Sequence, residues 1–306
     1  MRRVINTLRS LTPLWLRRKI GPFTGWCFYF FRVHVRGKTW EPNVLSIKET
    51  LIKIDAENLS AIRFGDGEIS LMEEIDLGFQ KHDASLADAL DEVLKAQDDK
   101  LLICIPGIFS NLSTFSNLGF WFEIHHLFRY SNVWKKLTSP EKTYGDAFFA
   151  RPYFTFKDKS EVPKIYELIN NLWKNKDIIL IEGEKSRLGV GNDLFDEVNS
   201  LKRILGPAEN AFSKKDAVIS KVIRFPKDTL ILLSLGPAAK VIGYELFNRG
   251  YRVIDIGHVD MEYEMFLQNS EKQIPVKYKY FNEINERNPE ECKDPEYLSQ
   301  IIAKIT

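Results

Sequence analysis

Short, continuous apolar runs alternate with amphipathic segments along the chain after residue 40. The clearest run is Leu101–Ile105, and strands buried on both faces of a parallel sheet show such uninterrupted runs. Runs of the same kind occupy residues 59–62, 177–181, 229–235 and 251–256. Between two of them, residues 83–96 place four apolar side chains on one helical face: Leu86, Leu90, Val93 and Leu94. The alternation predicts an α/β fold, Rossmann-like, with a mostly parallel sheet and helices on both faces.

Local signals predict where some helices begin and end. Ser160 and Ser213 are suited to cap helices, because a serine oxygen accepts from N–H groups that lack partners in the first turn. Pro237 suits the first position of a helix and Gly250 its end. Val218, Ile219, Val222 and Ile223 are expected to be buried on the helix after Ser213.

A chain of 306 residues is long enough for one large α/β domain or two small ones. We assign residues 41–281 to one domain, with a segment 1–40 before it and a polar tail 282–306 after it. The tail is expected to end in a short helix around residues 297–305. The three cysteines of the chain, Cys27, Cys104 and Cys292, are far apart. This spacing fits neither a disulfide framework nor a zinc site and favours a reducing cytoplasm.

Residues 1–40 combine nine Lys or Arg residues and many aromatic ones with no acid. The uncharged run 20–31 is shorter than the ~20 residues that cross a bilayer and contains glycines and a proline. We expect residues 1–36 to bind an anionic membrane surface, at the inner face of the cell membrane. The alternatives are packing on the domain and, more weakly, a signal peptide. The net charge of +1 argues against a general nucleic-acid binder.

A hexapeptide, Arg63-Phe64-Gly65-Asp66-Gly67-Glu68, follows the first apolar run. Asp66 and Glu68 are one glycine apart, a spacing that can direct both carboxylates at one hard divalent cation. Gly65 lets the backbone approach a ligand, and Arg63 adds a fixed cation. Ligands of open α/β sheets bind at strand ends. On spacing alone, an ordinary Gly-Asp-Gly turn is the alternative.

Residues 182–193 form a charged, glycine-bearing loop after another apolar run. Lys185 and Arg187 are suited to hold phosphate oxygens, while Asn192 and Asp193 are suited to bind a base, a sugar or a metal ion. The loop matches neither a P-loop nor a dinucleotide fingerprint, so a solvated surface loop is the alternative.

Two further segments suit phosphate binding. Residues 234–239 pass from a strand through Gly236 into a helix, whose first N–H groups can bind phosphate. Arg151 precedes a rigid proline and is suited to clamp a pyrophosphate. The alternatives are an ordinary β-α turn and a salt-bridged surface arginine.

Titratable residues alternate with small or apolar ones after the last apolar run, which ends at Asp255. In an extended segment, His258, Asp260 and Glu262 share one face and can supply a general base or a metal ligand, with Asp260 favoured as the base. The alternative is a helix start capped by Asp260. The adjacent His125 and His126 are interpreted as structural or solvent-facing.

Together these segments resemble the bacterial glycosyltransferases of the GT-D fold, long known as a conserved domain of unknown function, over residues 45–270. The matching segments, in order, are 63–68, 78–80, 151–153, 182–195, 203–204, 210–212, 235–237, 255–258 and 263–264. Ala238 and Ala239 depart from the family pattern, in which a threonine is expected after the proline.

The resemblance implies a metal-dependent transferase that uses a UDP-sugar, with Mn²⁺ or Mg²⁺ bound by Asp66 and Glu68. A divalent cation stabilises the departing diphosphate as a Lewis acid. If the reaction inverts, a carboxylate or histidine must take the acceptor's proton. The expected nucleotide site comprises Arg63, Gly65, Arg151, Lys185, Arg187, Asn192, Asp193 and Gly236.

The expected acceptor is an oligosaccharide, lipid-linked or protein-linked, in the synthesis of a surface or capsular polysaccharide or of a glycoprotein. A competing hypothesis is another nucleotide- or SAM-dependent transferase, because Asp255 follows Gly236 by about 20 residues, as in ribose-binding sites. A third hypothesis is a non-catalytic scaffold, and the presence of the carboxylate pair Asp66 and Glu68 argues against it.

Overall fold

Nine strands form one sheet within the residues that the computed structural model describes, which are 40–109, 112–281, 284 and 288–305. Their order is β1-β4-β3-β2-β8-β7-β5-β6-β9, and all neighbouring pairs are parallel. The strands are β1 (Asn43–Val44), β2 (Ser60–Arg63), β3 (Leu101–Ile105), β4 (Thr143–Asp146), β5 (Asp177–Gly183), β6 (Ser200–Gly206), β7 (Leu230–Ser234), β8 (Val253–Asp255) and β9 (Ile301–Lys304). The expected Rossmann-like parallel sheet is confirmed.

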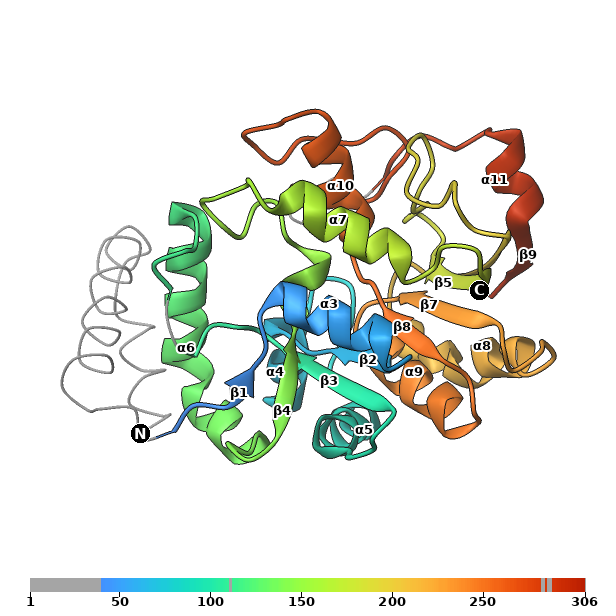
Figure 1. The fold of residues 1–306 in the computed structure, drawn as a ribbon. Coiled ribbons are helices and arrows are strands. Elements are labelled where there is room, and N and C mark those ends of the chain that lie inside the picture. Colours follow the sequence, from blue (N-terminus) through green and yellow to red (C-terminus); the bar gives the residue numbers. More distant parts are fainter. Residues whose placement is uncertain (1–39, 110–111, 282–283, 285–287, 306) are drawn as a thin grey trace.

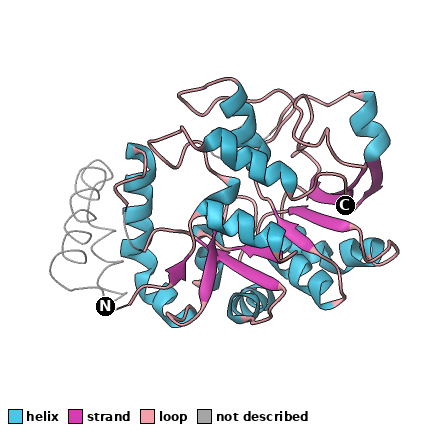
Figure 2. Ribbon diagram, in the orientation of Figure 1, coloured by secondary structure: helices cyan, strands magenta, loops and turns pink. Residues whose placement is uncertain are grey.

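Helices cover both faces of this sheet (Figures 1 and 2). One face carries α3 (Ile47–Ala56), α7 (Val162–Asn171) and α10 (Val259–Leu267). The other carries α4 (Asp66–Met72), α5 (Ala84–Lys95), α6 (Asn117–Leu137), α8 (Lys215–Val222) and α9 (Ala238–Asn248). Shorter elements are α11 (Pro295–Gln300) and the 3₁₀ turns η2 (Ala147–Ala150) and η3 (Ala211–Lys214).

A separate hydrophobic core lies on each face of the sheet. All five residues of β3 are buried, and Ile103 and Ile105 join one core while Leu102 and Cys104 join the other. Side chains alternate between the faces of a strand, so a strand covered on both sides has to be apolar throughout. This is why β3 was recognisable from its sequence.

The strand order reverses where β2 lies beside β8. From β2 the chain proceeds outward to β3 and β4, whereas β7 and β8 approach β2 from the other side. Ligands of open α/β sheets bind at the carboxyl ends of strands flanking such a reversal. The hexapeptide follows β2 and Asp255 ends β8, so both lie at this point.

The expected helix at residues 297–305 is wrong in its second half. α11 ends at Gln300, and Ile301–Lys304 forms β9, which pairs with β6 at the edge of the sheet. Without β9, the N–H and C=O groups along that edge of β6 would lack partners. The pairing is a long-range interaction, so the local sequence does not show it.

Some expected helix starts are also corrected. α7 begins at Val162 after Glu161, so Ser160 is not its cap. Ser213 lies inside η3, which starts after the left-handed Asn210, and its hydroxyl donates to the Asn210 carbonyl. α9 begins at Ala238, one residue after Pro237.

Burial of the helix after Ser213 is confirmed for three of four residues, because Ile223 is 47% exposed. The segment 1–40 lies outside the described residues except for Trp40. Within the described part of the chain, no helix combines the length and apolarity needed to cross a bilayer.

Candidate functional site

The hexapeptide turns from β2 into α4 at the strand-order reversal. Gly65 precedes the helix in an extended conformation, and Asp66 and Glu68 occupy the first turn of α4. Asp66 is exposed, whereas Glu68 is buried. The positive end of the helix dipole favours negative charge at this position. The two expected metal ligands therefore lie at one helix start in different environments.

A buried lysine that the sequence reading missed contacts the second of these carboxylates. Lys240, in the first turn of α9, places Nζ 3.1 Å from Glu68 Oε1 and 3.0 Å from Asp255 Oδ2. Glu68 Oε2 accepts from the Gly65 N–H at 2.8 Å. The available signal was a lone lysine inside the apolar run 238–243, where a charge needs a buried partner.

Arg63 joins β2 to β8 rather than extending from the sheet. Its Nε donates to the Asp255 carbonyl at 2.8 Å, and Nη2 lies 3.3 Å from Asp255 Oδ1. Its Nη1 donates to the Ala147 carbonyl at 3.2 Å. Gly257 has a φ of +44°, and a Cβ there would lie 1.8 Å from Arg63 Nη2, so a side chain at this position would displace the guanidinium. The guanidinium thus contacts protein groups on three sides.

Asp255 is charged because of these two cations. Burial alone would raise the pKa of Asp255, but the charges of Arg63 and Lys240 outweigh it and hold that pKa below its ordinary value. Both Asp255 oxygens are engaged, and its side chain is 1% exposed. This arrangement leaves no oxygen for a ribose hydroxyl.

Two further buried carboxylates, Glu123 and Asp146, interact with each other electrostatically, and the sequence reading missed both. Burial raises the pKa of Glu123 and the charge of Asp66 raises it further, whereas the hydrogen bond with His126 and the charge of Arg151 lower it. Burial raises the pKa of Asp146, at the end of β4, to about 7. Asp146 also accepts from the N–H groups of Gly107 and Phe148. Glu123 sits in the middle of an aromatic helix, where the sequence gives little reason to single it out.

Glu123 is oriented by a chain of hydrogen bonds within α6. Trp134 Nε1 can only donate, and it does so to His126 Nε2 at 2.9 Å. His126 Nε2 is therefore unprotonated, so Nδ1 carries the proton and donates it to Glu123 Oε2 at 3.1 Å. His126 is buried and structural and His125 is exposed, as expected from the sequence.

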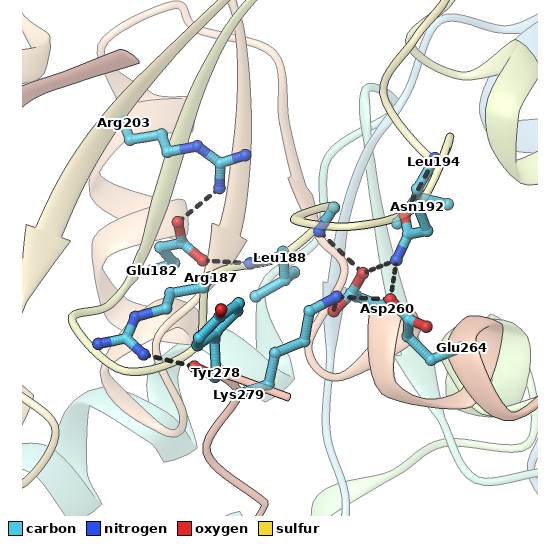
Figure 3. Close-up of polar contacts among 11 residues, drawn as sticks. Glu182, Arg187, Leu188, Asn192, Leu194, Arg203, Asp260, Glu264, Tyr278 and Lys279 are labelled. Atoms are coloured by element: carbon cyan, nitrogen blue, oxygen red, sulfur yellow. Dashed lines mark hydrogen bonds and ion pairs between the residues drawn. The ribbon is translucent and has the colours of Figure 1, made fainter. Parts of the chain in front are cut away.

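Asp260 occupies the centre of a separate buried network, shown in Figure 3. Its Oδ1 accepts from the Gly189 N–H and from Asn192 Nδ2, both at 2.8 Å. Lys279, fully buried, places Nζ 2.8 Å from Asp260 Oδ2 and 2.9 Å from Glu264 Oε1. The carboxylate thus fixes the loop 184–194 against the segment that follows α10.

The expected shared face of His258, Asp260 and Glu262 is wrong, because these residues begin α10 rather than an extended segment. The alternative, a helix start, is confirmed, but the residue before the helix is His258 and not Asp260. Residues four apart share a helix face, and Asp260 and Glu264 accordingly both accept hydrogen bonds from Asn192 Nδ2. Glu262 instead accepts from the Tyr153 and Phe154 N–H groups.

The other expected nucleotide-site residues of the 182–193 loop contact protein groups. Arg187 Nη1 donates to the Tyr278 and Glu290 carbonyls, both at 2.6 Å. Lys185 Nζ donates to Asn288 Oδ1 at 2.9 Å, and Asp193 Oδ1 accepts from the Tyr263 hydroxyl at 2.7 Å. Glu182 Oε1 lies 2.6 Å from Arg203 Nη1 on β6, and both side chains are buried. The loop is thereby tied to the C-terminal tail.

Gly236 meets two segments that are distant in the sequence. It is exposed with a φ of +55°, and a Cβ there would lie 3.0 Å from the Phe79 ring. The Asn210 N–H donates to the Phe79 carbonyl at 2.9 Å, and Asn210 Oδ1 accepts from the Lys81 N–H. A shallow hollow beside them is lined by Gln80, Lys81, His82, Asp83, Asn210, Phe212 and Ser213.

Residues 61–284 match the family model described as glycosyltransferase GT-D fold. The chain is 36% identical over 264 residues to the glycosyltransferase GlyD of Streptococcus pneumoniae serotype 4, covering 86% of this chain and 32% of GlyD. It is 37% identical over 269 residues to the probable glycosyl transferase Gly of Streptococcus gordonii, covering 86% of this chain and 39% of Gly. The chain thus spans between 32% and 39% of the length of these curated relatives.

Solved structures show the same likeness. One, described as a highly conserved domain of unknown function with a distinct glycosyltransferase fold, is 36% identical, with a TM-score of 0.83 over 87% of this chain and 96% of that one. Another, described as a new glycosyltransferase from Streptococcus sanguinis, is 35% identical, with a TM-score of 0.82 over 87% of this chain and 100% of that one.

Proposed function

The chain belongs to the glycosyltransferases of the GT-D fold, and from this premise we propose that it transfers a sugar from a UDP-sugar to a glycan hydroxyl with the help of Mn²⁺ or Mg²⁺. The proposed acceptor is an oligosaccharide on a lipid or a protein, in the synthesis of a surface polysaccharide or a glycoprotein. The proposed location is the cytoplasm, at the inner face of the cell membrane.

The observation that carries the proposal is the placement of Asp66 and Glu68 in one helix turn at the strand-order reversal. Mg²⁺ in phosphate-transfer sites takes one or two carboxylates, substrate phosphates and waters, rather than a cage of protein ligands. Exposed Asp66 fits that donor set directly. The Glu68 oxygens contact Lys240 and the Gly65 N–H, so Glu68 would bind the cation by giving up one of these contacts. Among the described residues, no three His, Cys, Asp or Glu side chains gather as a larger cage would. The bound cation would stabilise the charge on the departing diphosphate.

The region around Gly236 is the proposed place for the nucleotide. Gly236 is exposed at the start of α9, beside the Phe79 ring and the hollow at Asn210. N–H groups at a helix start favour a diphosphate, and an aromatic ring favours a base. Arg151 is near enough for its charge to lower the pKa of Glu123, and it remains our candidate for a phosphate contact.

Glu123 is our candidate for the group that takes the acceptor's proton, if the reaction inverts. One oxygen is held by the neutral His126, and burial with the nearby Asp66 raises its pKa, which makes the carboxylate a better base. The acceptor oxygen would bond to the sugar carbon while the bond to the diphosphate breaks and its electron pair leaves with UDP. Asp260 and Glu262 are engaged in holding backbone and loop groups, and we assign them a positioning role.

The test is a donor screen that measures UDP release from a panel of UDP-sugars with Mn²⁺, Mg²⁺ or excess chelator. We expect release with one or a few donors that chelator abolishes. Metal-independent release, or turnover of non-UDP donors alone, would overturn the proposal. Thermal-shift measurements with UDP, SAM and NAD separate the competing transferase classes, since a specific ligand raises the apparent stability. The engaged oxygens of Asp255 already argue against ribose recognition there.

A further inference from the structure

Helix α6 exposes large apolar side chains along one face. Leu118 is 72% exposed, Trp121 40% and Phe122 52%, and residues three and four apart lie on the same side of a helix. The same face continues through exposed His125, Arg129, Asn132, Lys135 and Lys136. Figure 1 shows α6 at the end of the molecule where β1 and β4 lie. A helix of 21 residues presents this face over about 32 Å.

The charge on this face has one sign. Arg129, Lys135 and Lys136 are exposed, and the sole acidic residue of α6, Glu123, is buried on the opposite side. A soluble helix normally mixes both signs on its polar face. Apolar and aromatic side chains interleaved with cations are typical of a helix that lies in the plane of an anionic membrane.

The chain enters the described structure beside this helix. The Trp40 ring lies 5.6 Å from the Phe109 ring, which in turn lies 5.6 Å from the ring of Trp134 on α6. Residues 1–40 add nine further cations and no acid. The cations of α6 and those of residues 1–40 thus both favour a negatively charged partner.

We propose that the exposed face of α6, with Leu118, Trp121 and Phe122 inserted and Arg129, Lys135 and Lys136 at the headgroups, binds an anionic lipid surface. An anionic bilayer complements both parts of the face at once, because it offers apolar burial below a negative surface. Each cation close to such a surface strengthens the attraction. The inference concerns α6 and does not require the segment 1–36 to bind lipid.

This placement also bears on the acceptor, a step that rests on the proposed function. The inner side of α6 carries Glu123, whose pKa responds to Asp66 and Arg151. A helix is about 10–12 Å across, so a membrane-bound α6 would bring the site within reach of a sugar carried on a lipid. It favours a lipid-linked over a protein-linked acceptor.

The test is co-sedimentation of the full chain with vesicles of phosphatidylcholine alone or mixed with phosphatidylserine. The variant Leu118→Ser, Trp121→Ser, Phe122→Ser removes the apolar part, and Lys135→Gln, Lys136→Gln removes part of the charge. The control Ile52→Ser, Ile223→Ser, Leu298→Ser removes side chains that are 53%, 47% and 48% exposed elsewhere. Circular dichroism establishes that each variant is folded.

We expect the full chain to bind the anionic vesicles, more weakly at high salt, and the control to bind equally well. The apolar variant should bind about tenfold more weakly or worse, since each lost side chain removes buried area. Equal binding by the apolar variant, or no binding by the unchanged chain, would refute the proposal. The proposal would also be refuted if the unchanged chain self-associates and the apolar variant abolishes that self-association. It would be refuted too if, without vesicles, residues 1–36 are protected from protease in the unchanged chain and lose that protection in the apolar variant. UDP release is measured separately, so failure of the lipid surface and failure of the transferase assignment are distinguishable.

Discussion

Lys240 Nζ lies 3.1 Å from Glu68 Oε1, and both side chains are buried. The same ammonium lies 3.0 Å from Asp255 Oδ2, so it links the start of α4 to the end of β8. Asp66, two residues before Glu68, is exposed. The two carboxylates of one short motif are therefore unequal: one is part of a buried ion network and the other faces outward.

Lys240→Met should destabilise the fold by about 3 kcal/mol, because removing one partner leaves buried charge without compensation. Glu68 would lose its cation, whereas Asp255 would keep Arg63. Urea denaturation measures the free energy of unfolding. Lys53→Met, which breaks an exposed pair with Glu57, is the control and should cost less than about 0.5 kcal/mol. Equal losses in both variants would contradict the network.

Asp66→Asn should reduce UDP release by about a hundredfold or more, because it removes a metal ligand, and should change the melting temperature little, because Asp66 is exposed. Glu68→Gln should reduce release as strongly and also lower the melting temperature, because it weakens the pair with Lys240. Mn²⁺ titration of activity gives the metal dependence of each. Full activity in both variants would remove the metal assignment.

The central sheet could be predicted from the sequence because its strands are buried on both faces. β3, β5, β7 and β8 are apolar runs whose positions were expected within a few residues. β6 was not expected, since Lys202 and Arg203 interrupt its apolar pattern, and Arg203 is buried only because Glu182 on β5 neutralises it. Such compensation depends on a strand neighbour that no local pattern specifies.

The sequence places Asp66, Glu68 and Asp255 after two strands of one sheet, and in the structure Glu68 and Asp255 meet around Lys240 while Asp66 lies in the same helix turn as Glu68. Their functional roles stay predictions. The roles of Arg187 and Asp260 could not be read from the sequence, because their partners Tyr278 and Lys279 lie far along the chain. A charged loop that binds a ligand and one that binds the protein's own tail have the same composition.

Asp146 should make stability depend on pH. Its folded pKa is about 7, raised by burial, against about 3.9 unfolded. The folded state therefore holds the proton more tightly, so this contribution is complete below about pH 4 and is lost as pH rises to about 7, by at most ~1.4 kcal/mol per unit. Asp146→Asn should remove that loss, since an amide keeps the contacts with Gly107 and Phe148. Its stability gain over the unchanged chain should grow across this range and level off above it.

The control for this measurement is Asp88→Asn, which changes an exposed carboxylate on α5. Its stability difference from the unchanged chain should be small and independent of pH between about 4 and 7. Urea midpoints at several pH values measure both variants. A constant difference for Asp146→Asn as well would show that the folded Asp146 titrates in its ordinary range.

Asp260→Asn should lower the melting temperature and weaken the hold on the loop 184–194, because Lys279 loses one of its two anionic partners. Gly189 and Asn192 both donate to Oδ1, so an amide that keeps its oxygen there turns its NH₂ group toward the Lys279 ammonium, and the reverse orientation opposes the Gly189 and Asn192 donors. We expect a raised KM for the donor with an unchanged pH profile of kcat. A large loss of kcat at an unchanged melting temperature would instead make Asp260 the proton acceptor.

Glu123→Gln should instead lower kcat and leave the melting temperature nearly unchanged. The amide oxygen can still accept from His126 Nδ1, so the helix and the melting temperature should change little. The amide cannot take a proton, so kcat should fall by about 10²–10⁴-fold. In the unchanged chain, activity should fall on the acid side as Glu123 protonates, at a pH above the ordinary pKa of a glutamate because burial raises its pKa. The residual activity of Glu123→Gln should not show this fall at acid pH. If the fall persists in the variant, or if the variant is fully active, another group takes the acceptor's proton.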